Sequence, residues 1–189
     1  MTTIGFIRHG ITDWNIEKRD QGQMDIPLNQ AGIHQARSLS ERLKGESWDF
    51  LYASDLSRAK QTAQIIADVL GIQVQTDVRL REIHCGEREG TTLEDRISKW
   101  GPHCEAMDLG VETHESVINR GLAAIKDIIE SHPDKRILIV SHGTMIELLL
   151  TQLIPQQAAE EIKNTALTMI TQMNGGWKCV LYNCIEHIG

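Results

Sequence analysis

Two short apolar runs, far apart in the chain, each end in a histidine and a glycine. Ile4–Ile7 leads into Arg8-His9-Gly10, and Ile137–Val140 leads into Ser141-His142-Gly143-Thr144. Continuous apolar runs of this length are typical of strands that are buried on both faces of a parallel sheet. Ligands of open α/β sheets bind at the carboxyl ends of such strands, so we expect both histidines at one binding edge. A helix beginning near Thr144 would direct free backbone N–H groups at an anion there.

Apolar residues recur at helical spacing in several other segments. The predicted helices extend from an N-cap at Asn29 to a stop at Gly45, from a cap at Ser54 or Asp55 to Gly71, over Leu93–Trp100, from Glu115 to His132-Pro133, and over a polar segment after Pro155. Further strands are predicted at Phe50–Ala53 and Val74–Leu80, and at Leu167–Met173 and Trp177–Tyr182, which flank the hairpin signal Asn174-Gly175-Gly176.

This alternation of strands and helices predicts an α/β fold. We expect a three-layer α/β/α sandwich with a mostly parallel central sheet, in a single domain over residues 1–189. Residues 91–112 show the weakest pattern, and we interpret them as a candidate lid.

Composition narrows the class of protein. With 41% hydrophobic and 24% charged residues the chain can bury a core of its own, and its net charge of -7 argues against nucleic acid or an anionic membrane as a partner. No apolar stretch approaches the about 20 residues needed to span a bilayer, and the N-terminus does not resemble a signal segment. The four cysteines fall at no metal-finger spacing, so we expect reduced thiols in a cytoplasmic protein.

Two charged features of the sequence are candidates for the same binding site as the histidines. Arg58 falls in the first turn of a predicted helix, where a cation opposes the helix dipole by about 0.3–1 kcal/mol unless it shares a bound anion. The charged run Arg81–Gly90 lies in a predicted loop, a typical place for a carboxylate over a pocket. At this point a solvated surface arginine and a solvated loop remain open as alternatives.

Residues 8–15, 54–63, 82–90 and 141–144, taken together, resemble the histidine phosphatase superfamily, which also contains cofactor-dependent phosphoglycerate mutase. The hallmark Arg-His-Gly matches Arg8-His9-Gly10, and the other motifs follow in family order. The resemblance implies a metal-independent phosphomonoesterase without a cofactor, acting on a small phosphorylated substrate. It implies a phosphohistidine on His9, Glu82 as general acid and base, Arg8 and Arg58 as phosphate clamps, and His142 as a third donor. Asn15, Gln21, Gly22, Gly143 and Thr144 are implied substrate contacts, with loop hydrogen bonds as the alternative for several of them.

The chemistry of phosphoryl transfer needs these residue types. An in-line nucleophile must meet phosphorus inside a cationic shell around three equatorial oxygens. A histidine nucleophile divides one displacement into two easier steps, and planar guanidinium groups donate paired hydrogen bonds to phosphate oxygens.

Several positions depart from the family pattern and bear on the choice between activities. Ile11 stands where an acidic residue is common, and Arg88 stands where tryptophan commonly precedes Glu-Gly. Cys85 replaces the tyrosine of the mutase branch, and no Arg-Arg pair occurs between Gly90 and Glu115. We therefore favour a phosphatase, with phosphoglycerate mutase as the alternative. A third hypothesis, zinc bound by His84-Cys85 and His103-Cys104, is disfavoured because structural zinc ligands come in tighter pairs. No residue pattern specifies an oligomeric state.

Overall fold

The computed structural model describes residues 1–157, 160–173 and 175–188. In this part of the chain six strands form one sheet in the order β3-β2-β4-β1-β5-β6. The strands are β1 (Thr3–Arg8), β2 (Phe50–Ala53), β3 (Val74–Thr76), β4 (Arg136–Ser141), β5 (Leu167–Met173) and β6 (Gly176–Cys184). The pairings among β1 to β4 are parallel, whereas β5 and β6 run antiparallel to their neighbours. The predicted mostly parallel α/β sheet is confirmed.

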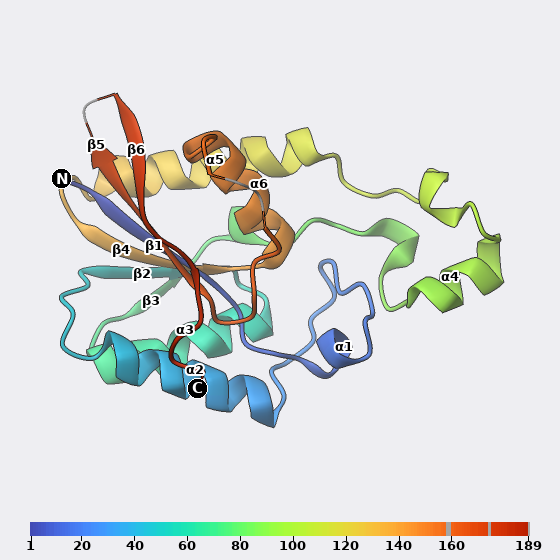
Figure 1. The fold of residues 1–189 in the computed structure, drawn as a ribbon, viewed down its shortest axis with the longest axis horizontal. Coiled ribbons are helices and arrows are strands. Elements are labelled where there is room, and N and C mark those ends of the chain that lie inside the picture. The colour runs from blue at the N-terminus through green and yellow to red at the C-terminus, as the bar shows by residue number, and fades with distance from the viewer. Residues whose placement is uncertain (158–159, 174, 189) are drawn as a thin grey trace.

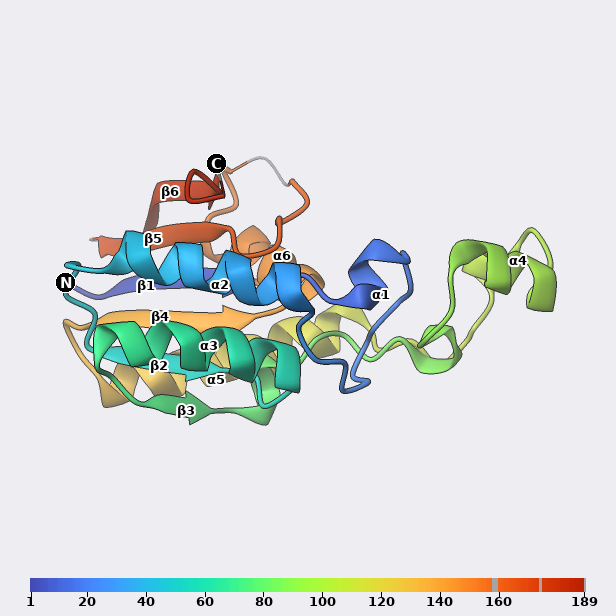
Figure 2. The same ribbon diagram turned by 90° about the horizontal axis from the view of Figure 1, so that it is seen from below.

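Helices cover both faces of this sheet (Figure 2). The longer ones are α2 (Gln30–Leu43), α3 (Ser57–Leu70), α5 (His114–Ser131) and α6 (Gly143–Leu153), and the shorter ones are α1 (Asp13–Ile16) and α4 (Leu93–Trp100). Three single turns of 3-10 helix, η1 (Val78–Leu80), η2 (Gly86–Arg88) and η3 (Cys104–Ala106), punctuate the loops. No helix of the described residues is long and apolar enough to cross a membrane.

The sequence of strand β4 is apolar at consecutive positions because the strand packs on both of its faces. Ile137 and Ile139 pack in the cluster formed with α5 and α6, while Leu138 and Val140 pack in the cluster formed with α2 and α3. Side chains of a strand alternate between the faces, so a strand covered on both sides needs apolar residues at every position. Burying each such side chain contributes about 1.5–3 kcal/mol to stability.

Two expectations at helix and strand boundaries were wrong. Helix α3 begins at Ser57, and neither Ser54 nor Asp55 caps it. Asp25 accepts hydrogen bonds from the Ser57 N–H and Oγ at 2.6 and 2.7 Å instead, because Asp55 is engaged in a bidentate pair with Arg81.

The predicted strand Val74–Leu80 is also shorter than expected. It stops at Thr76, where the Asp77 side chain accepts the Arg79 N–H at 2.8 Å and begins η1. An aspartate that bonds the backbone two residues ahead favours a turn over a strand.

The predicted polar helix after Pro155 does not form within residues 155–157 and 160–166, which are turns and irregular chain. Side chains hold this segment, since Glu147 accepts the Ile162 N–H and Asn183 accepts the Lys163 N–H, both at 3.0 Å. Residues 158–159 of the predicted helix, and Asn174 of the predicted hairpin turn, lie outside the described residues.

Residues 91–112 form an arm that extends beyond the sheet on the side of α1 (Figure 1, green). Its short helix α4 has the predicted bounds Leu93–Trp100. The arm is tied to the loop that follows α1, because Arg96 donates to Asp20 at 3.1 Å. Within the arm, Arg96 also donates to Glu105 at 2.9 Å. Its interpretation as a lid stays a prediction.

Candidate active site

Two buried histidines meet at the carboxyl ends of β1 and β4. Arg8 pairs in register with Ser141, so the residues that follow them, His9 and His142, leave the sheet at the same edge. Their ring centroids are 5.2 Å apart at an interplanar angle of 61°, and the two residues are 3% and 0% exposed. The structure thus brings together the two histidines that the apolar runs predicted at one edge.

The hydrogen bonding of His9 defines which ring nitrogen is free to react. Its Nδ1 lies 2.7 Å from the carbonyl oxygen of Gly10. A carbonyl only accepts, so Nδ1 carries the hydrogen and the lone pair is on Nε2. Burial, reinforced by the positive charges of Arg58 and Arg8, lowers the pKa of His9 well below its usual value. At neutral pH the ring is therefore an uncharged imidazole with an available Nε2 lone pair.

Arg58 is completely buried and belongs to the site, which excludes the surface alternative. Its Nη1 and Nη2 donate to the carbonyl oxygens of Met24 and Gly22 at 2.8 and 2.7 Å. Burial lowers its pKa to about 10, against the attraction of Glu82 and Asp25 that raises it. The guanidinium therefore remains a cation at neutral pH.

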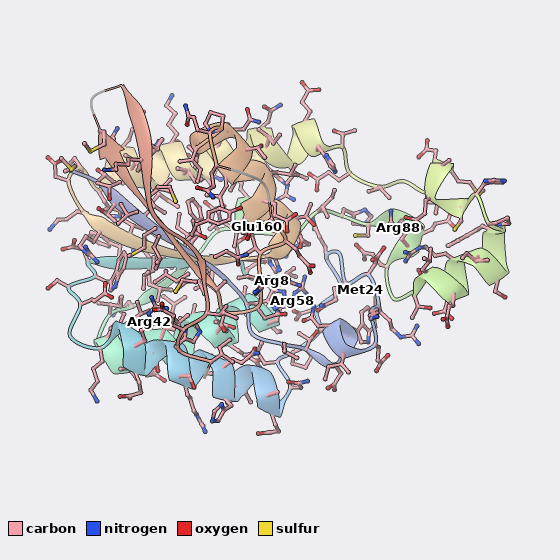
Figure 3. All side chains as sticks on the ribbon, in the orientation of Figure 1. Arg8, Met24, Arg42, Arg58, Arg88 and Glu160 are labelled. Atoms are coloured by element: carbon pink, nitrogen blue, oxygen red, sulfur yellow. The ribbon has the colours of Figure 1, made fainter. Side chains whose placement is uncertain are left out.

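Arg8 supplies the second guanidinium of the same cleft (Figure 3). Its Nη1 donates to the Ile162 carbonyl at 2.6 Å and lies 3.7 Å from a Glu161 carboxylate oxygen. Gly143 packs against it, since a Cβ added there would be 3.4 Å from the guanidinium carbon. The Nε atoms of Arg8 and Arg58 are both buried and have no hydrogen-bond partner among the described residues. Buried donors are nearly always paired, so these N–H groups are suited to a bound anion.

Glu82 occupies the N-terminus of α6. Its carboxylate accepts the N–H groups of Ile83, Met145 and Thr144 at 2.9, 3.0 and 3.2 Å. The helix that begins near Thr144 does direct N–H groups at an anion, but this anion is the protein's own carboxylate. The expectation that these groups face a bound ligand is corrected accordingly.

A cleft of about 170 Å³ joins most of the predicted residues. Its lining includes the following predicted ones: Arg8, His9, Asn15, Gln21, Gly22, Arg58, Glu82 and Thr144. His142 and Gly143 are not in the lining, and they lie behind it against His9 and Arg8. The rest of the lining consists of Arg19, Asp20, Ile83 and Cys85. Sequence reasoning did not single out Arg19, Asp20 or Ile83 as site residues.

Three lining residues of the first loop have distinct local roles. The Asn15 side chain forms a capping box with Thr12 at the start of α1. Gly22 has φ +49°, and a Cβ there would come within 2.1 Å of the Glu89 carboxylate, so only glycine fits. The Oε1 of Gln21 is buried without a partner among the described residues, which leaves it free for a ligand.

The hypothesis of a zinc site finds no support in the geometry. No group of three or more potential ligand side chains is clustered within residues 1–157, 160–173 and 175–188. Burial, with Asp20 and Glu82 nearby, also raises the pKa of the Cys85 thiol to about 12. A thiol must be deprotonated to bind a metal or to attack a substrate, so Cys85 is suited to neither role.

The buried histidines predict how stability depends on pH. Burial and the nearby arginines lower the pKa of both His9 and His142 far below 6.5. Below that pH the unfolded chain binds protons that the folded chain does not, so stability is lost as the pH falls. We expect the free energy of unfolding to drop between pH 7 and 5 by up to about 1.4 kcal/mol per pH unit for each histidine.

Urea unfolding at pH 7.5, 6.5 and 5.5 measures this slope. The variant His9→Asn removes one of the two groups and should show a shallower slope, whereas His34→Asn, on the exposed surface of α2, should not. Identical slopes in all three proteins would contradict the assignment.

Comparison with known proteins points to one family. The model of the histidine phosphatase superfamily (branch 1) matches residues 4–185. A protein named uncharacterized phosphatase PhoE of Bacillus subtilis (strain 168) is 34% identical, and the match covers 100% of this chain and 97% of that protein. A protein named probable phosphoglycerate mutase GpmB of Proteus mirabilis (strain HI4320) is 33% identical, with coverage of 94% and 88%.

Solved structures resemble the fold over its whole length. YhfR of Bacillus stearothermophilus has a TM-score of 0.90 at 29% identity, with 100% of both chains covered. Phosphoserine phosphatase from Entamoeba histolytica, solved in complex with 3-phosphoglyceric acid, has a TM-score of 0.83 at 28% identity and the same coverage.

Proposed function

Because the chain belongs to the histidine phosphatase superfamily (branch 1), we propose that it is a metal-independent phosphomonoester hydrolase. In this proposal His9 is the nucleophile and Glu82 the general acid and base. The observation that carries it is the neutral His9 imidazole, whose Nε2 is free, in one cleft with two buried guanidinium groups and a carboxylate. Phosphatases among the relatives and the structural neighbours support the same activity.

Substrate binding uses the buried donors that the protein leaves unpaired. The Nε–H groups of Arg8 and Arg58 donate to the phosphate oxygens, and His142 adds a third donor, since neither of its ring nitrogens has a partner among the described residues. Gln21 and Asn15 contact the substrate from the first loop. These fixed donors need no reorganisation when charge shifts in the transition state.

The reaction then proceeds in two displacements. The His9 Nε2 attacks phosphorus and forms an N–P bond while the ester P–O bond breaks, and Glu82, which must enter this step as the protonated carboxylic acid, gives its proton to the leaving oxygen. In the second step Glu82 takes a proton from water as the water attacks phosphorus and the N–P bond breaks. Inorganic phosphate leaves and both residues return to their starting states.

The two arginines of the cleft lead to a prediction about metal ions. Arg8 and Arg58 already supply the charge that a divalent cation would otherwise provide. Hydrolysis of p-nitrophenyl phosphate should therefore proceed at an unchanged rate in EDTA. A metal-dependent phosphatase assayed in parallel serves as the control for chelation. Loss of activity in EDTA that magnesium or zinc restores would contradict the proposal.

Phosphoglycerate mutase is the alternative, and relatives carry that name. A mutase needs a second cationic site in the cleft for bisphosphoglycerate. In this chain Arg96 of the arm and Arg88 just before the arm are already committed, since both pair with Asp20 and Glu105. Charges that are neutralised in this way leave no strong attraction for a second phosphate, which favours the phosphatase.

We further propose small phosphorylated metabolites as the substrates and the cytoplasm as the location. The cleft volume of about 170 Å³ supports a small substrate. A panel of phosphorylated metabolites, scored by release of inorganic phosphate, tests this part. Interconversion of phosphoglycerates without release of phosphate would instead establish the mutase.

A further inference from the structure

The backbone that leads from η1 to Glu82 is held by side chains. Four consecutive carbonyl groups, those of residues 79 to 82, each accept a hydrogen bond from a side chain. Arg120 Nη1 donates to the carbonyls of Arg79 and Arg81 at 2.8 and 2.6 Å, and its Nη2 donates to that of Glu82 at 2.9 Å. Ser141 Oγ donates to the remaining carbonyl, that of Leu80, at 2.7 Å.

Arg120 lies in the second turn of α5 and all five of its N–H groups are used. Besides the three carbonyl bonds, its Nε and Nη2 donate to the two carboxylate oxygens of Glu112, both at 2.9 Å. A guanidinium has five donors in a rigid fork, whereas a lysine ammonium has three on a flexible chain. The geometry therefore requires arginine, not simply a positive charge.

Glu112 orients the guanidinium and is itself fixed. It also accepts the Ser116 hydroxyl at 2.8 Å and the His84 N–H at 3.1 Å. Burial alone would raise the pKa of Glu112, but the hydrogen bonds from Arg120 and His84 lower it to about 2. The pair therefore stays ionised at every pH at which the enzyme would be assayed.

We propose that Arg120, oriented by Glu112, is a positioning residue for the general acid Glu82. The inference rests on the proposed function and adds a residue that does not touch the substrate, since Arg120 does not line the cleft. Helix α6 holds the Glu82 carboxylate, whereas the Glu82 carbonyl is held by Arg120 of α5 and also accepts the Gln23 Nε2–H at 3.1 Å. Different elements therefore fix the two ends of this residue. A displacement of about 1 Å in a catalytic group can cost about 100-fold in rate.

The test compares Arg120→Lys with the matched control Arg79→Lys. Arg79 lies in the same segment, but its guanidinium bonds only Asp77 and Asp127. We expect Arg120→Lys to lower kcat for glycerol 3-phosphate at least about tenfold more than it slows phosphoenzyme formation from p-nitrophenyl phosphate, whose leaving group needs little protonation. The inhibition constant of inorganic phosphate should stay within about twofold, because Arg8 and Arg58 are untouched. Arg79→Lys should change neither substrate's rate.

The double variant Arg120→Lys/Glu82→Gln separates positioning from general damage. If Arg120 acts through Glu82, the double variant should lose no more activity than Glu82→Gln alone. The inference would be overturned if Arg120→Lys slowed both substrates equally, or if the loss of activity in the double variant equalled the product of the losses in the two single variants. If Arg120→Lys does not fold, Glu112→Gln takes its place with the same expected selectivity. If Glu82→Gln itself does not discriminate between the substrates, the proposed function fails instead.

Discussion

Replacing His9 with alanine is expected to abolish turnover and to leave the fold intact. The substitution removes the proposed nucleophile, and neither Cys85, whose thiol is protonated, nor the buried His142 can replace it in line. The lost ring makes one hydrogen bond, to Gly10, so the cost to folding is that of one buried side chain. Release of phosphate from p-nitrophenyl phosphate should fall to the detection limit, while circular dichroism and cooperative unfolding are retained.

A matched control is His34→Ala, on the exposed surface of α2, which should keep full activity. His142→Ala should lose less activity than His9→Ala, because it removes a donor to phosphate and not the nucleophile. Hydrolysis near the wild-type rate by His9→Ala would exclude the mechanism.

Replacing Glu82 with glutamine is expected to have the second largest effect, and the effect should depend on the leaving group. General acid catalysis contributes about 10²–10⁴-fold when the leaving group is a poor one such as an alkoxide. A stabilised phenolate leaves without a proton and should suffer much less. Glutamine is close in shape, and its amide oxygen can still accept the Ile83 and Met145 N–H groups that now bond Oε1, whereas the hydrogen bond from the Thr144 N–H to Oε2 is lost.

Rapid-quench measurement of phosphoenzyme formation, with one alkyl and one aryl phosphate, isolates the first step from the attack of water. Glu87→Gln is the control within the same loop, since Glu87 is exposed and only approaches Lys99, at 3.9 Å. If Glu82→Gln slows the first step equally for both substrates, Glu82 is not the leaving-group acid. Glu89, which lines no part of the cleft but contacts its loop, would then be the next residue to test.

Local patterns in the sequence were sufficient to predict the two strands that carry His9 and His142. The apolar runs that end in His9 and His142 could be assigned to buried parallel strands, because a strand covered on both faces has no polar position. The register of β1 with β4 then places both histidines at one edge. Helix α2 was equally predictable, since its N-cap Asn29 accepts the Gly32 N–H as the capping pattern requires.

What the sequence did not predict depends on partners distant in the chain. The cap of α3 is Asp25, which is 32 residues from Ser57, and Asp55 is unavailable because Arg81 binds it. The anion at the start of α6 is Glu82, about 60 residues earlier in the chain. Such pairings follow from the topology of the sheet and have no signature in local spacing or propensity.

The arm and the Arg120 contacts illustrate a second limit of local patterns. Arg120 looks like an ordinary polar position on α5, and only the path of residues 79–82 past that helix gives it three carbonyl partners. Likewise, the pairing of Arg88 and Arg96 with Asp20 joins two predicted loops and a predicted helix that lie apart in the sequence.

The central claim is that His9 carries the phosphoryl group, and trapping the intermediate tests it most directly. Wild-type enzyme and His9→Ala are mixed with a labelled aryl phosphate, quenched within the first turnover, and treated with acid or base. The account predicts label on the wild-type protein that is acid-labile and base-stable, as expected for phosphohistidine, and no label on His9→Ala. Base-labile label, which indicates a phosphorylated carboxylate, or label that persists on His9→Ala, would contradict it.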